Sequence, residues 1–97
     1  MPDANASPES PRFSLGHLCI TQNANAVLHP EDVHHALTRH ASGDWGELDD
    51  HDRLENELAL ANGFRLFSVY RDRSSTKFWI ITEADRSITT VLLPEDY

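Results

Sequence analysis

The sequence has little cysteine, few basic residues and no long apolar run. Its one cysteine, Cys19, excludes an internal disulfide. No stretch approaches the roughly 20 consecutive apolar residues of a membrane-spanning helix, and no segment resembles a secretory leader. We therefore expect a cytoplasmic protein without membrane contact, which folds without a disulfide, a metal or another cofactor.

Basic residues are half as numerous as acidic ones, 8 against 16, and the formal net charge is −8. Such a charge repels phosphate backbones and anionic lipids, which disfavours nucleic acid and membranes as general partners. Residues 44–57 contain seven of the acids and one base, Arg53. Residues 64–90 carry a small positive excess, so we expect an acidic end and a mildly basic end.

A length of 97 residues suits one small domain. Residues 1–11 hold three prolines and almost nothing apolar, which predicts a disordered tail before a single domain over residues 12–97. Alternation in residues 13–21 predicts a strand, with Cys19 as a small buried residue. Thr21 favours a short helix over residues 22–28, which Pro30 interrupts.

Two longer helices are predicted next. The first begins at Pro30 and ends at Ser42 and Gly43. Its apolar face consists of Val33, Ala36, Leu37 and His40. The second is capped by Asp49 or Asp50 and ends at Asn62 and Gly63. Its buried face is predicted to consist of Leu54, Leu58 and Ala61, widened by Leu60.

Residues 64–71, 77–83 and 88–93 alternate with period two or are β-branched and aromatic, which predicts a three-stranded antiparallel meander. Trp45 lies in a glycine turn between the helices and is expected to fold back onto the core, because an exposed indole is costly. The fold class is therefore α+β, a single small domain with a three- to four-stranded antiparallel sheet packed by two to three helices.

Four histidines invite a search for a metal site: His34, His35, His40 and His51. Ligand pairs on a helix use the i, i+4 spacing, whereas His40 follows the first two at i+6 and i+5. The spacing disfavours a metal, and His40 is expected to be a packed or capping residue. The role of the group as a whole stays open.

A catalytic set can also be drawn from residues near the turns, with His40 and Asp44 transferring protons and Arg86 orienting a phosphate. An anion site would then use Arg65, Arg71, Lys77 and Arg86. The alternative is structural. Gly43 and Asp44 would close a turn, Asp85 would accept turn amides, and Arg86 would pair with Glu83 or Asp85.

The acids after the turn form a candidate interaction surface: Asp44, Glu47, Asp49, Asp50, Asp52 and Glu55. They would engage a basic partner protein or imitate a row of phosphates. The same residues also suit an ordinary solvated helix start, since carboxylates match the positive end of the helix dipole. The sequence leaves both alternatives open, and with them the partner and the oligomeric state.

Several stretches have a characteristic wording: residues 37–40 (LTRH), 42–48 (SGDWGEL), 79–87 (WIITEADRS) and 89–97 (TTVLLPEDY), with Asn56, Ala59, Leu60 and Gly63. In these the chain resembles a family of small uncharacterised proteins of bacterial plasmids and integrative conjugative elements. The resemblance implies an origin on a mobile element and a cytosolic setting. It brings no established activity and assigns no catalytic residue.

The order of helices followed by a meander that carries Arg and Lys is also loosely similar to RelE-type RNA-cleaving toxins, although those are usually basic. Two hypotheses follow. The preferred one is a non-enzymatic accessory protein of a mobile element that binds a basic host or element protein, for example as a DNA mimic against a defence complex. The other is a small RNA-binding or RNA-cleaving domain.

Overall fold

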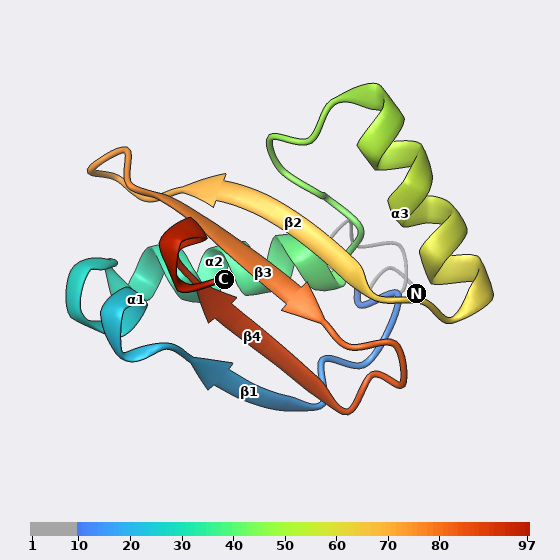
Figure 1. The fold of residues 1–97 in the computed structure, drawn as a ribbon, viewed down its shortest axis with the longest axis horizontal. Helices are drawn as coiled ribbons and strands as arrows, with labels where there is room; N and C mark the ends of the chain where they lie inside the picture. Colours follow the sequence, from blue (N-terminus) through green and yellow to red (C-terminus); the bar gives the residue numbers. More distant parts are fainter. Residues whose placement is uncertain (1–9) are drawn as a thin grey trace, which may run out of the picture.

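The computed structural model describes residues 10–97, so most of the predicted disordered tail lies outside the described residues. In chain order the elements are β1 (His17–Ile20), α1 (Gln22–Val27), α2 (Pro30–Ala41), α3 (Asp50–Asn62), β2 (Leu66–Arg71), β3 (Lys77–Thr82), β4 (Ile88–Leu92) and the 3-10 turn η2 (Pro94–Asp96). They form one α+β domain (Figure 1). No helix in this described range is both long and apolar enough to cross a membrane.

The sheet has the strand order β1-β4-β3-β2. The predicted meander is confirmed, since β2, β3 and β4 pair antiparallel, with Leu66 opposite Thr82 and Thr82 opposite Thr89. The expectation of a purely antiparallel sheet is wrong, because β1 pairs parallel to β4. Alternation along a strand predicts which side chains share a face, but it carries no information on which strand becomes the neighbour.

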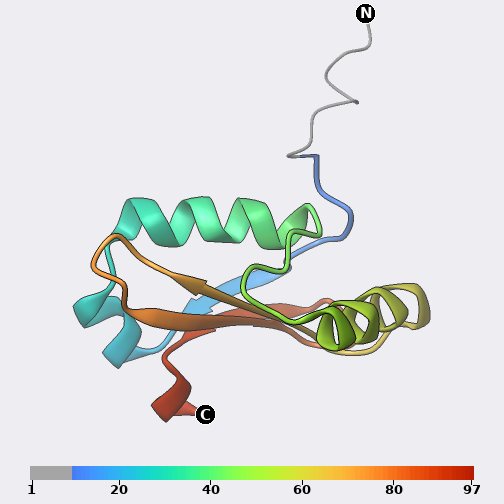
Figure 2. The same cartoon turned by 90° about the horizontal axis from the view of Figure 1, so that it is seen from above.

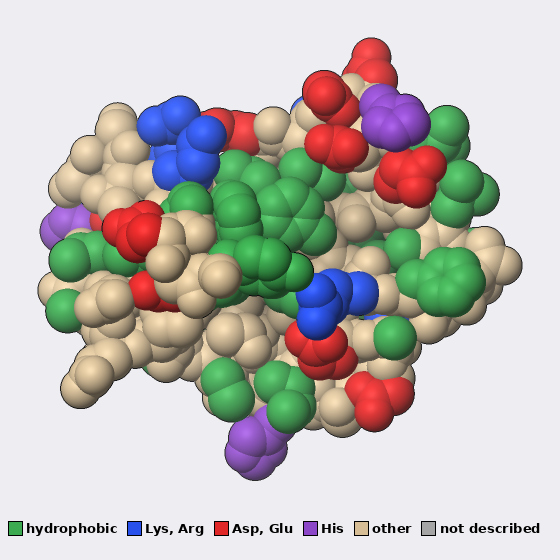
Figure 3. All heavy atoms as spheres, in the orientation of Figure 1, with side chains coloured by type: hydrophobic (Ala, Val, Ile, Leu, Met, Phe, Trp, Pro, Cys, Tyr) green, Lys and Arg blue, Asp and Glu red, His purple; other side chains and the backbone are tan. Residues whose placement is uncertain are grey.

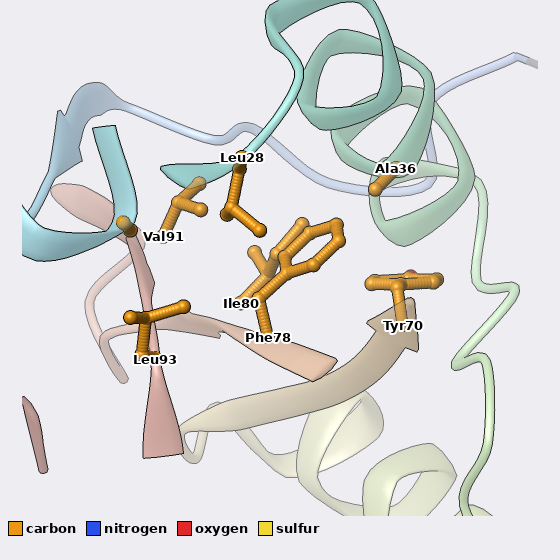
Figure 4. Packing of buried hydrophobic residues seen from close by; sticks show 8 residues of the cluster. Leu28, Ala36, Tyr70, Phe78, Ile80, Val91 and Leu93 are labelled. Carbon is orange, nitrogen blue, oxygen red and sulfur yellow. The ribbon is translucent and has the colours of Figure 1, made fainter. Parts of the chain in front are cut away.

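Helix α2 covers one face of the sheet, as Figure 2 shows. Its predicted face is confirmed: Ala36 and His40 are buried, and Val33 and Leu37 pack against the core. Figure 4 shows the core between α2 and the sheet, with Phe78 and Ile80 at its centre. The other members of this buried cluster are Ala24, Leu28, Ala36, Tyr70, Val91 and Leu93.

Helix α3 lies beside β2 at the edge of the sheet rather than across its face (Figures 1 and 2). The predicted boundaries are confirmed: the Asp49 side chain accepts from the Asp52 amide, and Gly63 ends the helix in the left-handed conformation. The predicted buried face is wrong. The buried residues are Asn56 and Ala59, whereas Leu54, Leu58 and Ala61 are exposed and only Leu60 of the predicted face packs against the core.

The reason for this reversal is that α3 is attached through a polar group. The Asn56 side chain donates to the Phe67 carbonyl and accepts from the Phe67 amide, as a neighbouring strand would. Those two bonds occupy the outer edge of β2 at Phe67. Because an edge offers backbone hydrogen-bonding groups and little apolar area, an asparagine suits it better than a leucine stripe.

Trp45 is buried in a second cluster with Leu48, Ala59, Leu66 and Val69, which confirms that it folds back onto the core. The turn reaches β2 at Gly46, which forms a bridge to Val69. Gly46 has φ +73°, and a Cβ there would collide with the Val69 carbonyl. Only glycine therefore allows this close approach.

The first strand is shorter than predicted, since only His17–Ile20 is regular. Gly16 precedes it with φ +65°, which interrupts the extended backbone. Cys19 is exposed, so the expectation that it is a small buried residue is wrong. Because β1 is the outermost strand and α2 covers only one face of the sheet, the side of β1 that carries Cys19 has no layer above it.

Candidate protein-interaction surface

The outward side of α3 carries an apolar stripe. Leu54 is 59% exposed and Leu58 is 50% exposed, and Phe64 just beyond the helix is 63% exposed. Residues four apart on a helix share a face, so the two leucines lie next to each other. Figure 3 shows apolar side chains gathered on this side of the molecule, beside a group of acidic ones. Neighbouring exposed apolar residues mark interaction sites more often than single ones do.

The acids of the predicted interaction surface divide into two groups. The Asp44 carboxylate forms an ion pair with Arg39, whose Nε lies 2.7 Å from Oδ2. The Glu47 carboxylate pairs with Arg71, whose Nε lies 3.1 Å from Oε2. Arg39 also holds the pKa of Asp44 below its usual value through their hydrogen bond. These two carboxylates are already paired within the fold, so a partner would have to compete with Arg39 and Arg71 for them.

The second group stays available. Asp50, Asp52 and Glu55 are exposed, and within residues 10–97 no ion pair involves them. Asp49 is committed to capping α3. We call Leu54, Leu58 and Phe64, together with Asp50, Asp52 and Glu55, the α3 surface.

A groove of about 500 Å³ follows the junction of α3 and β2. It is lined by Glu55, Asn56, Leu58, Ala59, Asn62, Phe64 and Arg65. The α3 surface is therefore more than a row of charges, because it combines a hollow, an apolar floor and carboxylates at the rim.

The groove meets a second apolar area on the sheet face opposite α2. There the Trp79 ring contacts Phe67 and Tyr97 edge to face, with ring centres 5.1 and 5.7 Å apart. Arg65 lies between the two areas and donates to the Tyr97 hydroxyl and to Glu83. A hollow of about 280 Å³ is lined by these three aromatic rings, Arg65 and Ile81. Figure 3 shows this apolar area at the centre of the face.

The alternative catalytic set is placed differently. His40 is fully buried, its ring contacts Phe13 and Trp45 edge to face, and both ring nitrogens are engaged by hydroxyl groups. This confirms that His40 is a packed residue. A histidine enclosed in this way cannot reach a substrate unless the core opens.

The hydrogen bonds around His40 determine its tautomer. The Thr89 hydroxyl donates to the Leu15 carbonyl at 2.7 Å, so its oxygen accepts from Thr82 at 2.7 Å. The Thr82 oxygen then accepts from Nε2–H of His40 at 2.9 Å. Nδ1 is left to accept from the Ser68 hydroxyl. Every member of this chain is satisfied by a neutral imidazole with its proton on Nε2.

Burial gives the same result, because it lowers the pKa of His40 to about 3, with a further contribution from the Arg86 charge. Arg86 itself is occupied. It donates to the carbonyls of Phe64, Glu83, Ala84 and Ala59, and so fastens the β3–β4 turn to the end of α3. The expected ion pair of Arg86 with Glu83 or Asp85 is absent from residues 10–97. Glu83 pairs with Arg65 instead, and the Asp85 carboxylate accepts hydrogen bonds from the amide and hydroxyl of Ser87.

The cations proposed for an anion site are not gathered into one. Arg65 pairs with Glu83 and Arg71 pairs with Glu47, while Lys77 lies opposite Arg71 at the far end of β2 and β3. The histidines do not assemble either: within residues 10–97 no group of three or more His, Cys, Asp or Glu is arranged to hold a metal ion.

Sequence reasoning missed one feature of this surface, the exposed leucines of α3. The leucine stripe of α3 has the spacing of a core face, and only its neighbours hint otherwise. The acids Asp50 and Glu55 flank the stripe, and Asn56 lies on the opposite side of the helix, the side that carries Ala59 and is buried. That asparagine was the available signal.

Comparison with family models, with curated proteins and with solved structures finds no match to this chain. The function is therefore inferred from the surfaces themselves.

Proposed function

We propose that this chain is a non-enzymatic accessory protein that binds a basic, amphipathic segment of a partner protein on its α3 surface. The observation that carries the proposal is that Leu54 and Leu58, spaced as a core face, are exposed beside three unpaired carboxylates. An apolar stripe with an acidic rim complements a helix or loop that carries apolar residues and lysines or arginines.

The pattern of unpaired charge favours this partner over a DNA-binding protein, which the chain would bind by mimicking DNA. A phosphate mimic needs a long row of free carboxylates, whereas Asp44 and Glu47 are held by Arg39 and Arg71. The partner is then a basic protein of the host or of the mobile element that the sequence wording suggests. Burial of His40 and the engagement of Arg86 by carbonyls support a binding role over RNA cleavage.

The test is a pull-down from cells that carry the parent element, with purified variants compared against the wild type. Leu54→Ala/Leu58→Ala removes the stripe, and Asp50→Lys/Asp52→Lys reverses the rim. We expect both variants to lose the same captured protein at least tenfold, because each removes one half of the complementarity. Asp49 is left unchanged because it caps α3.

The control is Glu95→Lys, which alters an exposed carboxylate in η2, away from α3. It should capture the protein as well as the wild type does. Capture that is undiminished in both α3 variants would contradict the proposal, as would equal loss in the control. Circular dichroism of each variant separates lost binding from lost folding.

A further inference from the structure

The two edges of the sheet are treated differently by the fold. At β2 the edge is closed, since Asn56 pairs with Phe67 and the turn pairs with Val69, whose carbonyl accepts from the Glu47 amide at 2.8 Å. At β1, the outermost strand on the other side, nothing comparable is present within residues 10–97. Natural sheets usually protect such an edge with charge, proline or a covering segment.

The free hydrogen-bonding groups of β1 can be assigned to two residues. The amides of His17 and Thr21 donate to Ser87 and Val91, towards β4. Because successive residues of a strand point their backbone groups to opposite sides, the N–H and C=O groups of Leu18 and Ile20 point outward, away from the sheet. Both side chains are exposed as well, Leu18 at 55% and Ile20 at 39%.

This edge is also free of charge in a strongly charged protein. Residues 13–30 contain no Asp, Glu, Lys or Arg, although the chain as a whole carries −8. A groove of about 320 Å³ runs between β1 and α2, lined by Pro11, Leu15, Leu18, His34, Leu37, Thr38 and Ala41. Two copies of an acidic protein repel each other over most of their surface, and this uncharged strip is where they can meet without that cost.

We propose that β1 is the interface of a homodimer, in which two copies pair their β1 strands antiparallel about a twofold axis at Cys19. In this register Leu18 of each copy lies opposite Ile20 of the other, and the two pairs exchange four backbone hydrogen bonds. Within one copy, Leu18 and Ile20 lie next to Thr89 and Val91 of β4, on the sheet face that α2 covers. Leu18 and Ile20 of both copies, four apolar side chains in all, would therefore form one row on that face.

The neighbouring registers are poorer because of the residues that flank β1. An axis at Leu18 would pair Ile20 with Gly16, whose φ of +65° is not extended. An axis at Ile20 would pair Leu18 with Gln22, which belongs to α1. Each alternative keeps only one hydrogen-bonded pair. The axis at Cys19 joins the two four-stranded sheets into one continuous eight-stranded sheet, with the two α3 surfaces at its opposite ends.

This register gives Cys19 a diagnostic position. Cys19 of one copy lies opposite Cys19 of the other at a non-hydrogen-bonded position of the antiparallel pair. The two Cα atoms are then about 4.5 Å apart, a distance at which a disulfide can form. Mild oxidation by oxidised glutathione should therefore cross-link the wild type. The cysteine serves only as a reporter, because the pairing itself rests on the backbone of Leu18 and Ile20.

Three variants in a Cys19→Ser background measure the register by cross-linking rate: Leu18→Cys, Ile20→Cys and Leu54→Cys. The first two place cysteines that lie diagonally across the axis, and the third reports random collision from α3. We expect Cys19 to cross-link at least tenfold faster than any of them. Equal rates for all four cysteines would overturn the proposal, and fastest cross-linking from position 18 or 20 would overturn the register.

Sedimentation equilibrium under reducing conditions tests the dimer without the thiol. The interface is small, so association is expected to be weak and to require protein concentrations of about 0.1 to 1 mM. Leu18→Glu should raise the dissociation constant at least tenfold by placing charge at the uncharged edge. Leu54→Glu, the same change at a similarly exposed leucine of α3, should change the dissociation constant less than twofold.

A wild type that stays monomeric throughout this range would overturn the proposal and would leave the β1 edge to a different protein. Loss of dimer in both glutamate variants would also count against it, because it would indicate a general charge effect. The α3 pull-down is independent of this outcome, since the two surfaces lie at opposite edges of the sheet.

Discussion

Helices α2 and α3 are similar in length and both carry an apolar stripe at helical spacing, yet the fold uses the stripes in opposite ways. The stripe of α2 lies against the sheet face, where Ala36 and His40 are buried. The stripe of α3 points to solvent, with Leu54 and Leu58 exposed. A sheet face offers apolar area, and a sheet edge offers backbone groups.

The difference teaches that an amphipathic pattern identifies a face that needs a partner without saying whether the partner is internal. For α2 the partner is the sheet. For α3 the contact with the sheet is the edge of β2, which Asn56 satisfies, so Leu54 and Leu58 stay exposed. The comparison can be tested by changing one helix at a time.

The largest effect is expected at the buried side of α2. His40→Ala leaves a cavity and removes the partners of the Ser68 and Thr82 hydroxyls. The expected loss of unfolding free energy is about 3 kcal/mol, measured by urea denaturation. His40→Gln keeps a donor and an acceptor and should recover about half of it. If His40→Ala lowered the free energy of unfolding by less than about 1 kcal/mol, the buried side of α2 would contribute little to the stability of the core, contrary to this prediction.

The next effect is a pH dependence that arises from His40 on α2. The pKa of folded-state His40 is lowered from 6.5 to about 3, so protonation favours the unfolded chain. The stability contribution of neutral His40 is complete above pH 6.5 and decreases as the pH falls towards 3. Between pH 7.5 and pH 5 the free energy of unfolding should fall by about 2 kcal/mol.

Urea denaturation at the two pH values measures this loss, with His40→Gln as the control. The variant lacks the titrating group, so its stability should depend much less on pH in this window. The acidic residues contribute at lower pH, because their ordinary pKa values lie near 4. An equal pH dependence in the wild type and the variant would contradict the buried, neutral assignment of His40.

The smallest effect is expected at the outward side of α3. Leu54→Ala and Leu58→Ala should each change the free energy of unfolding by no more than about 0.5 kcal/mol, because both side chains are largely solvated and alanine is a good helix former. Leu37→Ala on α2, where the side chain packs against the core, is the matched control and should cost at least about 1 kcal/mol more. Similar losses of unfolding free energy in the α2 and α3 variants would contradict the proposed difference between the two helices.

Much of the local structure could be predicted from the sequence. The caps Thr21, Asp49 and Gly63 were correctly placed because capping depends on the side chain and its nearest backbone. The meander was predictable because hairpins join neighbours in the chain. The packed role of His40 was also predicted, since it shares a helical face with Leu37.

The candidate site was less predictable. The acids of residues 44–57 were visible, but Arg71 reaches Glu47 only through the tertiary fold, whereas Arg39 reaches Asp44 locally, across the turn that follows α2. The exposed leucines were assigned to the core because their spacing is that of a core face. The sequence offers no measure of which arginine lies near which carboxylate when the two are far apart in the chain, as Glu47 and Arg71 are at a separation of 24 positions.

The sequence by itself determined the helices, the strands of the meander and the helix caps, because these depend on interactions between residues close in the chain. Tertiary structure alone decided that β1 lies parallel to β4 and that α3 sits at the edge of β2 with its leucines outward. The physical reason is that apolar periodicity records what a segment can bury. What it does bury depends on the surfaces that distant segments leave open.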